Sequence, residues 1–411
     1  MLNKKNEREL AYVVTVDAIE PIEGKDRVEA AVVGGWRTMV RKGMFKPGDL
    51  GIYIEVDSQT PETAPFEFLS KYHYKIKTQK FKQFYSQGLL MHPSDFDWKL
   101  TNDMMPVGVI DNNNDVHFVE DESRFLTKQL GITYAVAEDN KRKAPSVDKY
   151  KKMAQRHPDL FKKPAFRWLM KRTWGKKLLF VFFGKAKDKR GGWPSWVVKT
   201  DEERIENMTF LLDNKEIKWY ATEKIDGSSS TFTMKRGKFN HNEYYVCSRN
   251  VCFDTPEKEN RCYYNTNIYM EMSEKYHIRQ VLQSILDKDA TLEYVTFQGE
   301  VYGEGVQKKT YNIKGHDLAL FNVIFGYKDG SKKRLNPLDM IIFIESFKIP
   351  CVPLLQTNYV LPDTVEELRA YVHSAPSIID NEIKEGIVFR TEDGEQSFKC
   401  VDPEFLIKFH S

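Results

Sequence analysis

The stretch Glu223-Lys224-Ile225-Asp226-Gly227-Ser228-Ser229 decides how this sequence is interpreted. It stands between two runs with strand-like composition, at residues 219–222 and 230–234. A lysine has a reference pKa of about 10.4, so it becomes a nucleophile only when its amine is desolvated or placed among other cations. The aspartate two residues later could hold a metal ion or orient the amine, and the glycine lets backbone approach a ligand. Ordinary surface turns contain similar short sequences, so the interpretation of this pattern needs support from the rest of the chain.

Composition is that of a soluble protein with two or three domains: 411 residues, of which 41% are hydrophobic and 29% charged. The N-terminus lacks the apolar core of a signal peptide, and the longest apolar run, residues 178–183, is too short to cross a membrane. Five cysteines, an odd number, do not suggest a disulfide scaffold, and Cys247, Cys252 and Cys262 lack the paired spacing of a zinc site. We expect an intracellular protein, cytoplasmic or nuclear, without stable membrane association.

Positive charge is concentrated in one segment. Residues 141–190 contain 18 lysines and arginines against 3 aspartates, a net charge of +15, so the remainder carries −12 of the total of +3. Aromatic residues are interleaved with these cations, as in segments that contact nucleic-acid backbones. The alternatives are a solvated basic insert without a partner and a segment that lies on a membrane surface.

The N-terminal pattern predicts a small β-barrel. Strand-like runs occupy residues 11–19, 28–40, 50–56 and the region of 88–91, and the second is interrupted at Gly34-Gly35. Short strands with glycine-rich corners favour an OB-like barrel. We therefore expect three parts: an OB-like domain at 1–130, a basic insert or linker at 131–190, and a second domain at 191–411.

The second domain is predicted to mix strands and helices, which makes the chain an α+β protein. Strands are expected at 243–247, 296–302, 317–325 and 386–390. Amphipathic spacing predicts a helix over 274–286, and start signals predict further helices at 338–347 and 364–372. A capping-box pattern occurs at Thr200-Asp201-Glu202-Glu203 and predicts a helix that extends through Met208.

Further charged and aromatic groups follow Lys224 in strand contexts. They are Ser248-Arg249-Asn250, Gln298-Gly299-Glu300, Phe321-Asn322, Glu385-Gly386-Ile387-Val388 and Lys399. In this order they resemble motifs Ia, III, IIIa, IV and V of the covalent nucleotidyltransferase superfamily of ligases and mRNA capping enzymes, with residues 224–227 as motif I. The resemblance implies a nucleotidyltransferase domain, related to ATP-grasp ligases, of antiparallel sheets and helices.

Within this superfamily the chain resembles Naegleria-type RNA ligases. DNA ligases and capping enzymes generally carry arginine two residues after the motif I glycine, where this chain has Ser229. They also place an OB domain after motif V, whereas the barrel expected here comes first and the sequence ends twelve residues after Lys399. Other segments that match the family are residues 22–27, 46–50, 86–89 and 199–204.

The resemblance implies ATP-dependent joining of RNA 3′-OH and 5′-phosphate ends, in RNA repair, by a monomer. Lys224 would attack the α-phosphorus of ATP. Lys399 would contact the α-phosphate and keep the Lys224 amine neutral by repulsion. Lys408 would assist. The family's motif V often has a second lysine two residues after the first, where this chain has Val401, and this departure leaves the role of Lys408 open.

The remaining roles are also implied by the resemblance. Asp226, Glu300 and Glu385 would hold Mg²⁺ or Mn²⁺, directly or through water. Arg249 would contact phosphate or ribose, and Phe321 would stack on adenine. Main-chain groups of Thr222 and Glu223 would meet the adenine edge. The plainer alternatives are salt bridges for the acids, a surface ion pair for Arg249, and a core position for Phe321.

Two other functions stay open from the sequence. One is an mRNA guanylyltransferase or DNA ligase, and the other is an OB-type RNA-binding protein with an inactive nucleotidyltransferase domain. His241, His277 and His316 are not grouped with a nucleophile in the sequence, so we expect structural roles for them.

Overall fold

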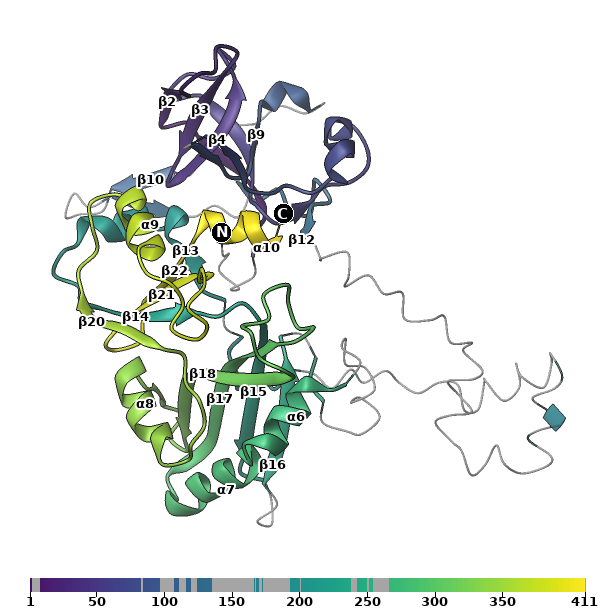
Figure 1. The fold of residues 1–411 in the computed structure, drawn as a ribbon, viewed down its shortest axis with the longest axis vertical. Helices are drawn as coiled ribbons and strands as arrows, with labels where there is room; N and C mark the ends of the chain where they lie inside the picture. Colours follow the sequence, from purple (N-terminus) through teal and green to yellow (C-terminus); the bar gives the residue numbers. More distant parts are fainter. Residues whose placement is uncertain are drawn as a thin grey trace.

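The computed structural model describes residues 1, 8–82, 84–96, 107–110, 116–119, 124–134, 166, 168, 169, 172, 193–199, 201–237, 242–249, 251–253 and 266–410. Figure 1 shows most of the N-terminal strands together in one part of the molecule, and most of the strands and helices after residue 200 in another. The basic segment 141–190 lies almost wholly outside the described residues, so its expected contact with nucleic acid stays a prediction.

Short antiparallel strands build the N-terminal part. They are β1 (Ala11–Thr15), β2 (Ala18–Pro21), β3 (Val28–Val33), β4 (Trp36–Arg41), β5 (Leu50–Ile54), β6 (Ser58–Gln59), β7 (Gln79–Phe81), β8 (Phe84–Ser86), β9 (Leu89–Met91), β10 (Val107–Ile110), β11 (Val116–Val119) and β12 (Thr133–Tyr134). They pair in the orders β1-β5-β9, β2-β3-β4, β7-β8, β10-β11 and β12-β6. Because β12 pairs with β6, this part includes residues just beyond the boundary expected at 130.

Two five-stranded sheets form the C-terminal part (Figure 1). The first sheet has the order β13-β22-β21-β14-β20, and the second has the order β16-β15-β17-β18-β19. Their strands are β13 (Glu203–Arg204), β14 (Trp219–Lys224), β15 (Ser228–Lys235), β16 (Glu243–Ser248), β17 (Leu292–Gly303), β18 (His316–Tyr327), β19 (Lys332–Arg334), β20 (Leu354–Tyr359), β21 (Gly386–Thr391) and β22 (Ser397–Val401). The helices are α6 (Ile268–Lys275), α7 (Ile278–Lys288), α8 (Pro337–Glu345), α9 (Val365–His373) and α10 (Pro403–His410).

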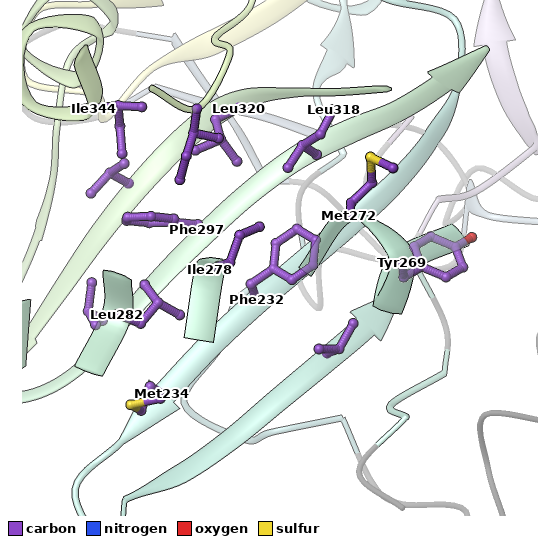
Figure 2. Packing of buried hydrophobic residues seen from close by; sticks show 14 of the residues in the cluster. Phe232, Met234, Tyr269, Met272, Ile278, Leu282, Phe297, Leu318, Leu320 and Ile344 are labelled. Carbon is purple, nitrogen blue, oxygen red and sulfur yellow. The ribbon is translucent and has the colours of Figure 1, made fainter. Parts of the chain in front are cut away.

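Each sheet packs its apolar face against helices. In the second sheet, Phe232 and Phe297 are fully buried against Ile278 and Leu282 of α7, and Figure 2 shows these side chains between strands and helix. In the first sheet, Phe398 belongs to a cluster that α9 covers. Burying aromatic side chains of this size supplies much of the stabilisation of such layers. The two sheets therefore form separate layers, and the chain passes between them directly after Lys224.

Most sequence-based expectations for the elements are confirmed. The predicted strands coincide with β16, β17, β18 and β21, and Gly34, with φ 55°, forms the turn between β3 and β4. Asn336 accepts a hydrogen bond from the Asp339 amide at the start of α8, and Thr364 completes a capping box at the start of α9. The α+β class is also confirmed, since antiparallel sheets and helices occur together in the part after residue 200.

One helix prediction is wrong, and another has a different start. The helix expected over 274–286 is confirmed as α7 but begins only at Ile278, because His277 adopts a left-handed conformation with φ 50°. The helix expected from the Thr200 capping box is replaced by β13, which pairs in parallel with β22, and by a short 3₁₀ helix at Ile205–Asn207. Strand pairing and contacts with the N-terminal part override the local helix signal at Glu203.

Within the described residues, no helix combines the length and apolar character needed to cross a membrane.

Candidate active site

Lys224 is the last residue of β14, in the first sheet, and Ser228 begins β15, in the second. The three residues between them carry the chain from one layer to the other. Lys224 is paired in register with Gly386, which places Glu385 beside it at the start of β21. Glu300 reaches the same place from β17, where it is paired with Ser229. Residues from three separate motifs therefore meet where the two sheets adjoin.

An ion pair holds the Lys224 side chain. Its Nζ donates to Glu385 Oε2 at 2.6 Å, and the lysine side chain is about one-quarter exposed, at 24%. Burial alone would lower the pKa of Lys224, but Glu385, Glu300 and Asp226 outweigh it, so the pKa is raised. The amine is therefore an ammonium in this arrangement, and repulsion by Lys399 does not by itself keep it neutral.

Negative charge exceeds positive charge around the lysine. Burial and the neighbouring carboxylates raise the pKa of Glu300 to about 8, and burial raises the pKa of Glu385. Asp226 is buried, and its Oδ2 has no hydrogen-bond partner among the described residues. Buried carboxylates without partners are costly, and a divalent cation with oxygen preference would offset that cost.

The three acids are not arranged to ligate one ion together directly. Over the described parts of the chain, no group of three His, Cys, Asp or Glu side chains is close enough to hold a metal ion. The unpartnered Asp226 oxygen and the excess of carboxylates nevertheless suit a cation that keeps its water ligands. Mg²⁺ in particular dehydrates reluctantly and is often bound through such waters. The donor set thus fits an ion held in part through water.

Tyrosine and glutamine side chains fix the loop that carries Asp226 and Gly227. The Asp226 amide donates to the Tyr311 hydroxyl at 2.6 Å, and Gln307 Nε2 donates to the Gly227 carbonyl at 3.0 Å. Gly227 is required because a Cβ there would lie 2.3 Å from the Val301 carbonyl oxygen. Tyr311 and Gln307 lie outside the motifs, and the sequence carries no local signal of their contacts with this loop.

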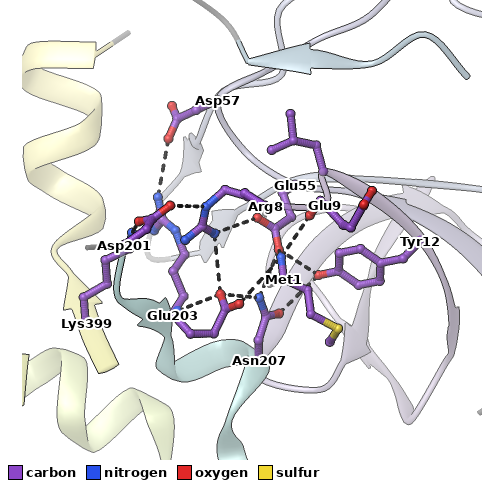
Figure 3. A network of polar contacts seen from close by, with 12 residues as sticks. Met1, Arg8, Glu9, Tyr12, Glu55, Asp57, Asp201, Glu203, Asn207 and Lys399 are labelled. Atoms are coloured by element: carbon purple, nitrogen blue, oxygen red, sulfur yellow. Dashed lines mark hydrogen bonds and ion pairs between the residues drawn. The ribbon is translucent and has the colours of Figure 1, made fainter. Parts of the chain in front are cut away.

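Lys399 and Arg249 meet at Asp201, close to the N-terminal part. Lys399 donates to Asp201 at 3.0 Å, Arg249 at 2.7 Å, and Arg8 at 3.0 Å. Figure 3 shows Asp201 between Lys399 and Arg8. Burial and cations such as Arg8 and Lys224 lower the pKa of Lys399 to about 8. Asp201, which the sequence placed in a matching segment and in a capping box, is the carboxylate that both predicted phosphate-binding cations contact.

Phe321 lies in β18, half-buried beside the cluster that contains Ile225, so its ring is near the lysine-bearing loop. Glu223 is fully engaged: its amide donates to the Pro353 carbonyl, and its carboxylate accepts from the Ser377 hydroxyl and the Ile378 amide. Thr222 donates through its hydroxyl to the Val388 carbonyl at 3.3 Å. These contacts order the strand next to the site.

The C-terminal helix α10 places Lys408 and His410 differently. Lys408 is exposed and pairs with Glu382 at 3.3 Å, away from the acids around Lys224. His410 Nε2 instead lies 3.3 Å from Asp226 Oδ1. Although burial opposes it, Asp226 raises the pKa of His410. Of the histidines considered from sequence, His316 pairs with Glu271, and His241 lies outside the described residues.

Comparisons with known proteins agree with this arrangement. Residues 217–409 match the RNA ligase family model, and residues 10–93 match an OB-fold domain model. No curated protein sequence matches the chain. Naegleria gruberi RNA ligase with PPi is similar in structure, with a TM-score of 0.66 and 25% identity, covering 98% of this chain and 99% of that one. A mutant of that ligase with ATP and Mn gives a TM-score of 0.67 at 25% identity, covering 98% of each chain. The chain therefore carries an RNA ligase domain of this family behind an N-terminal OB-fold domain.

Proposed function

We propose that this protein is an ATP-dependent RNA ligase that joins 3′-OH and 5′-phosphate ends and acts in RNA repair. The observation that carries the proposal is the position of Lys224 among Asp226, Glu300 and Glu385 within the matched ligase domain. The similar Naegleria gruberi ligase has been solved with ATP and Mn, which supports ATP as co-substrate and a divalent ion here. We propose further that the protein acts as a monomer.

In the first step, the Lys224 amine attacks the α-phosphorus of ATP. An N–P bond forms, the bond to pyrophosphate breaks, and the amine loses its proton. AMP then passes to the 5′-phosphate of RNA, and the 3′-OH attacks that phosphate and releases AMP. A divalent ion held by Asp226, Glu300 and Glu385, in part through water, would supply positive charge that lowers the pKa of Lys224 and stabilises negative charge on phosphate.

The remaining residues bind and orient. Lys399 and Arg249 leave Asp201 and meet phosphate oxygens, for which their charge is suited. Phe321 stacks on adenine, beside the lysine-bearing loop. Lys408, which faces Glu382, assists only through a change in its position. The basic segment 141–190 contacts the RNA backbone, and the OB-fold domain lies beside the ligase domain.

The test is covalent labelling with radioactive ATP. Lys224→Ala should lose both labelling and sealing, because the nucleophile is removed. Lys288→Ala, an exposed lysine at the end of α7, is the matched control and should label like the wild type. Label retained by Lys224→Ala would mean another nucleophile, and label from GTP alone would favour a guanylyltransferase. A wild-type protein that takes no label would support the inactive RNA-binding alternative. Sealing of nicked duplexes with RNA or DNA on each side of the nick separates RNA from DNA ligation.

A further inference from the structure

The C-terminal helix α10 connects the OB-fold part to the nucleophile. At its start, Glu404 accepts hydrogen bonds from Lys80 and Tyr85, which lie in β7 and β8 of the N-terminal part. In its middle, Phe405 and Leu406 are buried. Figure 1 shows α10 between the N-terminal strands and the first sheet of the C-terminal part. The start and the middle of α10 are thus fixed, which holds its last turn near the site.

The last turn presents a histidine, not a lysine, to the acids around Lys224. Lys408 points to Glu382, and its side chain is 55% exposed. Val401, at the position where the family pattern has a second lysine, is buried and uncharged. His410 is the residue of this region whose side chain reaches Asp226, at 3.3 Å.

Asp226 has little else to orient its carboxylate. Its main-chain amide is held by Tyr311, but its Oδ2 is buried without a hydrogen-bond partner among the described residues. Within that same part of the chain, His410 is the one side chain at ion-pair distance from the carboxylate. Glu385 and, from the N-terminal part, Asp57 also face the imidazole. The carboxylate next to the nucleophile therefore depends on α10 for its direction.

We propose that His410 is a positioning residue for lysine adenylylation, which rests on the proposed ligase function. Its Nε2–H holds the Asp226 carboxylate in the orientation in which that group acts beside Lys224. Within the described residues the two side chains lie 3.3 Å apart at ion-pair distance, and His410 Nε2 makes no hydrogen bond of good geometry. Contacts of this kind often tighten only when substrate is bound. Because Glu404 anchors the same helix to β7 and β8, the OB-fold part also contributes to the position of Asp226.

The test compares His410→Ala with His410→Gln in single-turnover formation of lysyl-AMP. Glutamine can place an N–H donor near the position of Nε2, whereas alanine cannot. At saturating ATP, His410→Ala should lower the rate constant by about tenfold to a hundredfold, the range expected for loss of a hydrogen bond to a charged group. The KM for ATP should change by less than about twofold, since the nucleotide contacts remain. His410→Gln should recover most of the rate.

The amplitude of the labelling reaction distinguishes a positioning defect from a folding defect. A variant that merely misfolds lowers the fraction of protein that can be labelled, while a positioning defect lowers the rate at full amplitude. His316→Ala is the matched control, because it removes a histidine–carboxylate pair with Glu271 outside the site. It should label at the wild-type rate.

Three outcomes would overturn the proposal: a wild-type rate in His410→Ala, a glutamine variant no better than alanine, or a loss confined to amplitude. Failure of the ligase function itself is distinguishable, because the wild-type protein would then take no label from ATP, which overturns both proposals together.

Discussion

At the scale of single residues, an ion pair between Lys224 and Glu385 occupies the centre of the site. Lys224 is held by Glu385 and its pKa is raised, whereas the pKa of Lys399 is lowered. The chemistry requires the opposite state of Lys224, a neutral amine. The protein supplies the lysine and the surrounding carboxylates. The positive charge that lowers the pKa of the Lys224 amine has to come from a group that binds between Lys224 and these carboxylates.

Glu300 makes that binding depend on pH. Its pKa is raised to about 8 by burial and by neighbouring carboxylates, so below pH 8 it is largely protonated and a poor metal ligand. The Mg²⁺ concentration for half-maximal adenylylation should therefore fall as pH rises from about 6.5 to 8.5, by up to about tenfold per pH unit below the pKa. Titration of activity with Mg²⁺ at several pH values measures this.

Glu300→Gln is the informative variant, since it should need more Mg²⁺ and lose this part of the pH dependence. Glu293→Gln, in the same strand β17 but paired with Lys235, should behave like the wild type. A wild-type Mg²⁺ requirement that does not change over this pH range would contradict the assignment of Glu300 as a metal-binding group.

At the scale of elements, the connection from β14 to β15 needs support from outside the motifs. The Tyr311 hydroxyl accepts the Asp226 amide, and Gln307 holds the Gly227 carbonyl. A short loop between two sheets cannot satisfy its own backbone groups, so side chains from the segment after β17 do so. Motif I is therefore rigid because of residues about eighty positions later in the chain.

Tyr311→Phe should destabilise the protein and slow adenylylation. The substitution leaves the Asp226 amide buried without an acceptor, which costs about 1–3 kcal/mol. Tyr294→Phe is the matched control, because the Tyr294 hydroxyl is buried without a hydrogen-bond partner among the described residues. Its removal should be neutral or stabilising. Thermal unfolding and single-turnover labelling of both variants check this, and equal behaviour of the two would count against a role for the Tyr311 hydroxyl.

At the scale of the whole molecule, buried charges join the two parts. Arg369 in α9 donates to Gln87 of the N-terminal part and to Glu206, each at 2.7 Å. Arg204 lies 3.4 Å from Asp57. The Glu206 side chain is fully buried, so its partner determines whether its charge is tolerated.

Arg369→Met should destabilise the protein by about 3–5 kcal/mol, because it leaves Glu206 charged, buried and unpaired. Adding Glu206→Leu should recover much of the loss, since both charges are then gone. Lys215→Met removes an exposed pair with Asp363 and should cost less than about 1 kcal/mol. Denaturant midpoints of the three proteins test the prediction, and a small effect of Arg369→Met would mean that water reaches Glu206.

The local sequence pattern determined many of the strands and helix starts of this protein. Alternation and helical spacing predicted β16, β17, β18 and β21 and the starts of α8 and α9, because each depends on neighbours within a few residues. The order of the motifs also indicated which acids accompany Lys224, and the structure brings Glu300 and Glu385 to it.

Tertiary structure alone decided the rest. Pairing with β22 made a strand of Glu203–Arg204, where a local capping signal indicated a helix. Packing against the N-terminal part brought Asp201 to Lys399, and the course of α10 turned Lys408 outward and His410 toward Asp226. These contacts join residues far apart in the sequence, so their free energy comes from burial and charge in the assembled fold, which no local pattern records.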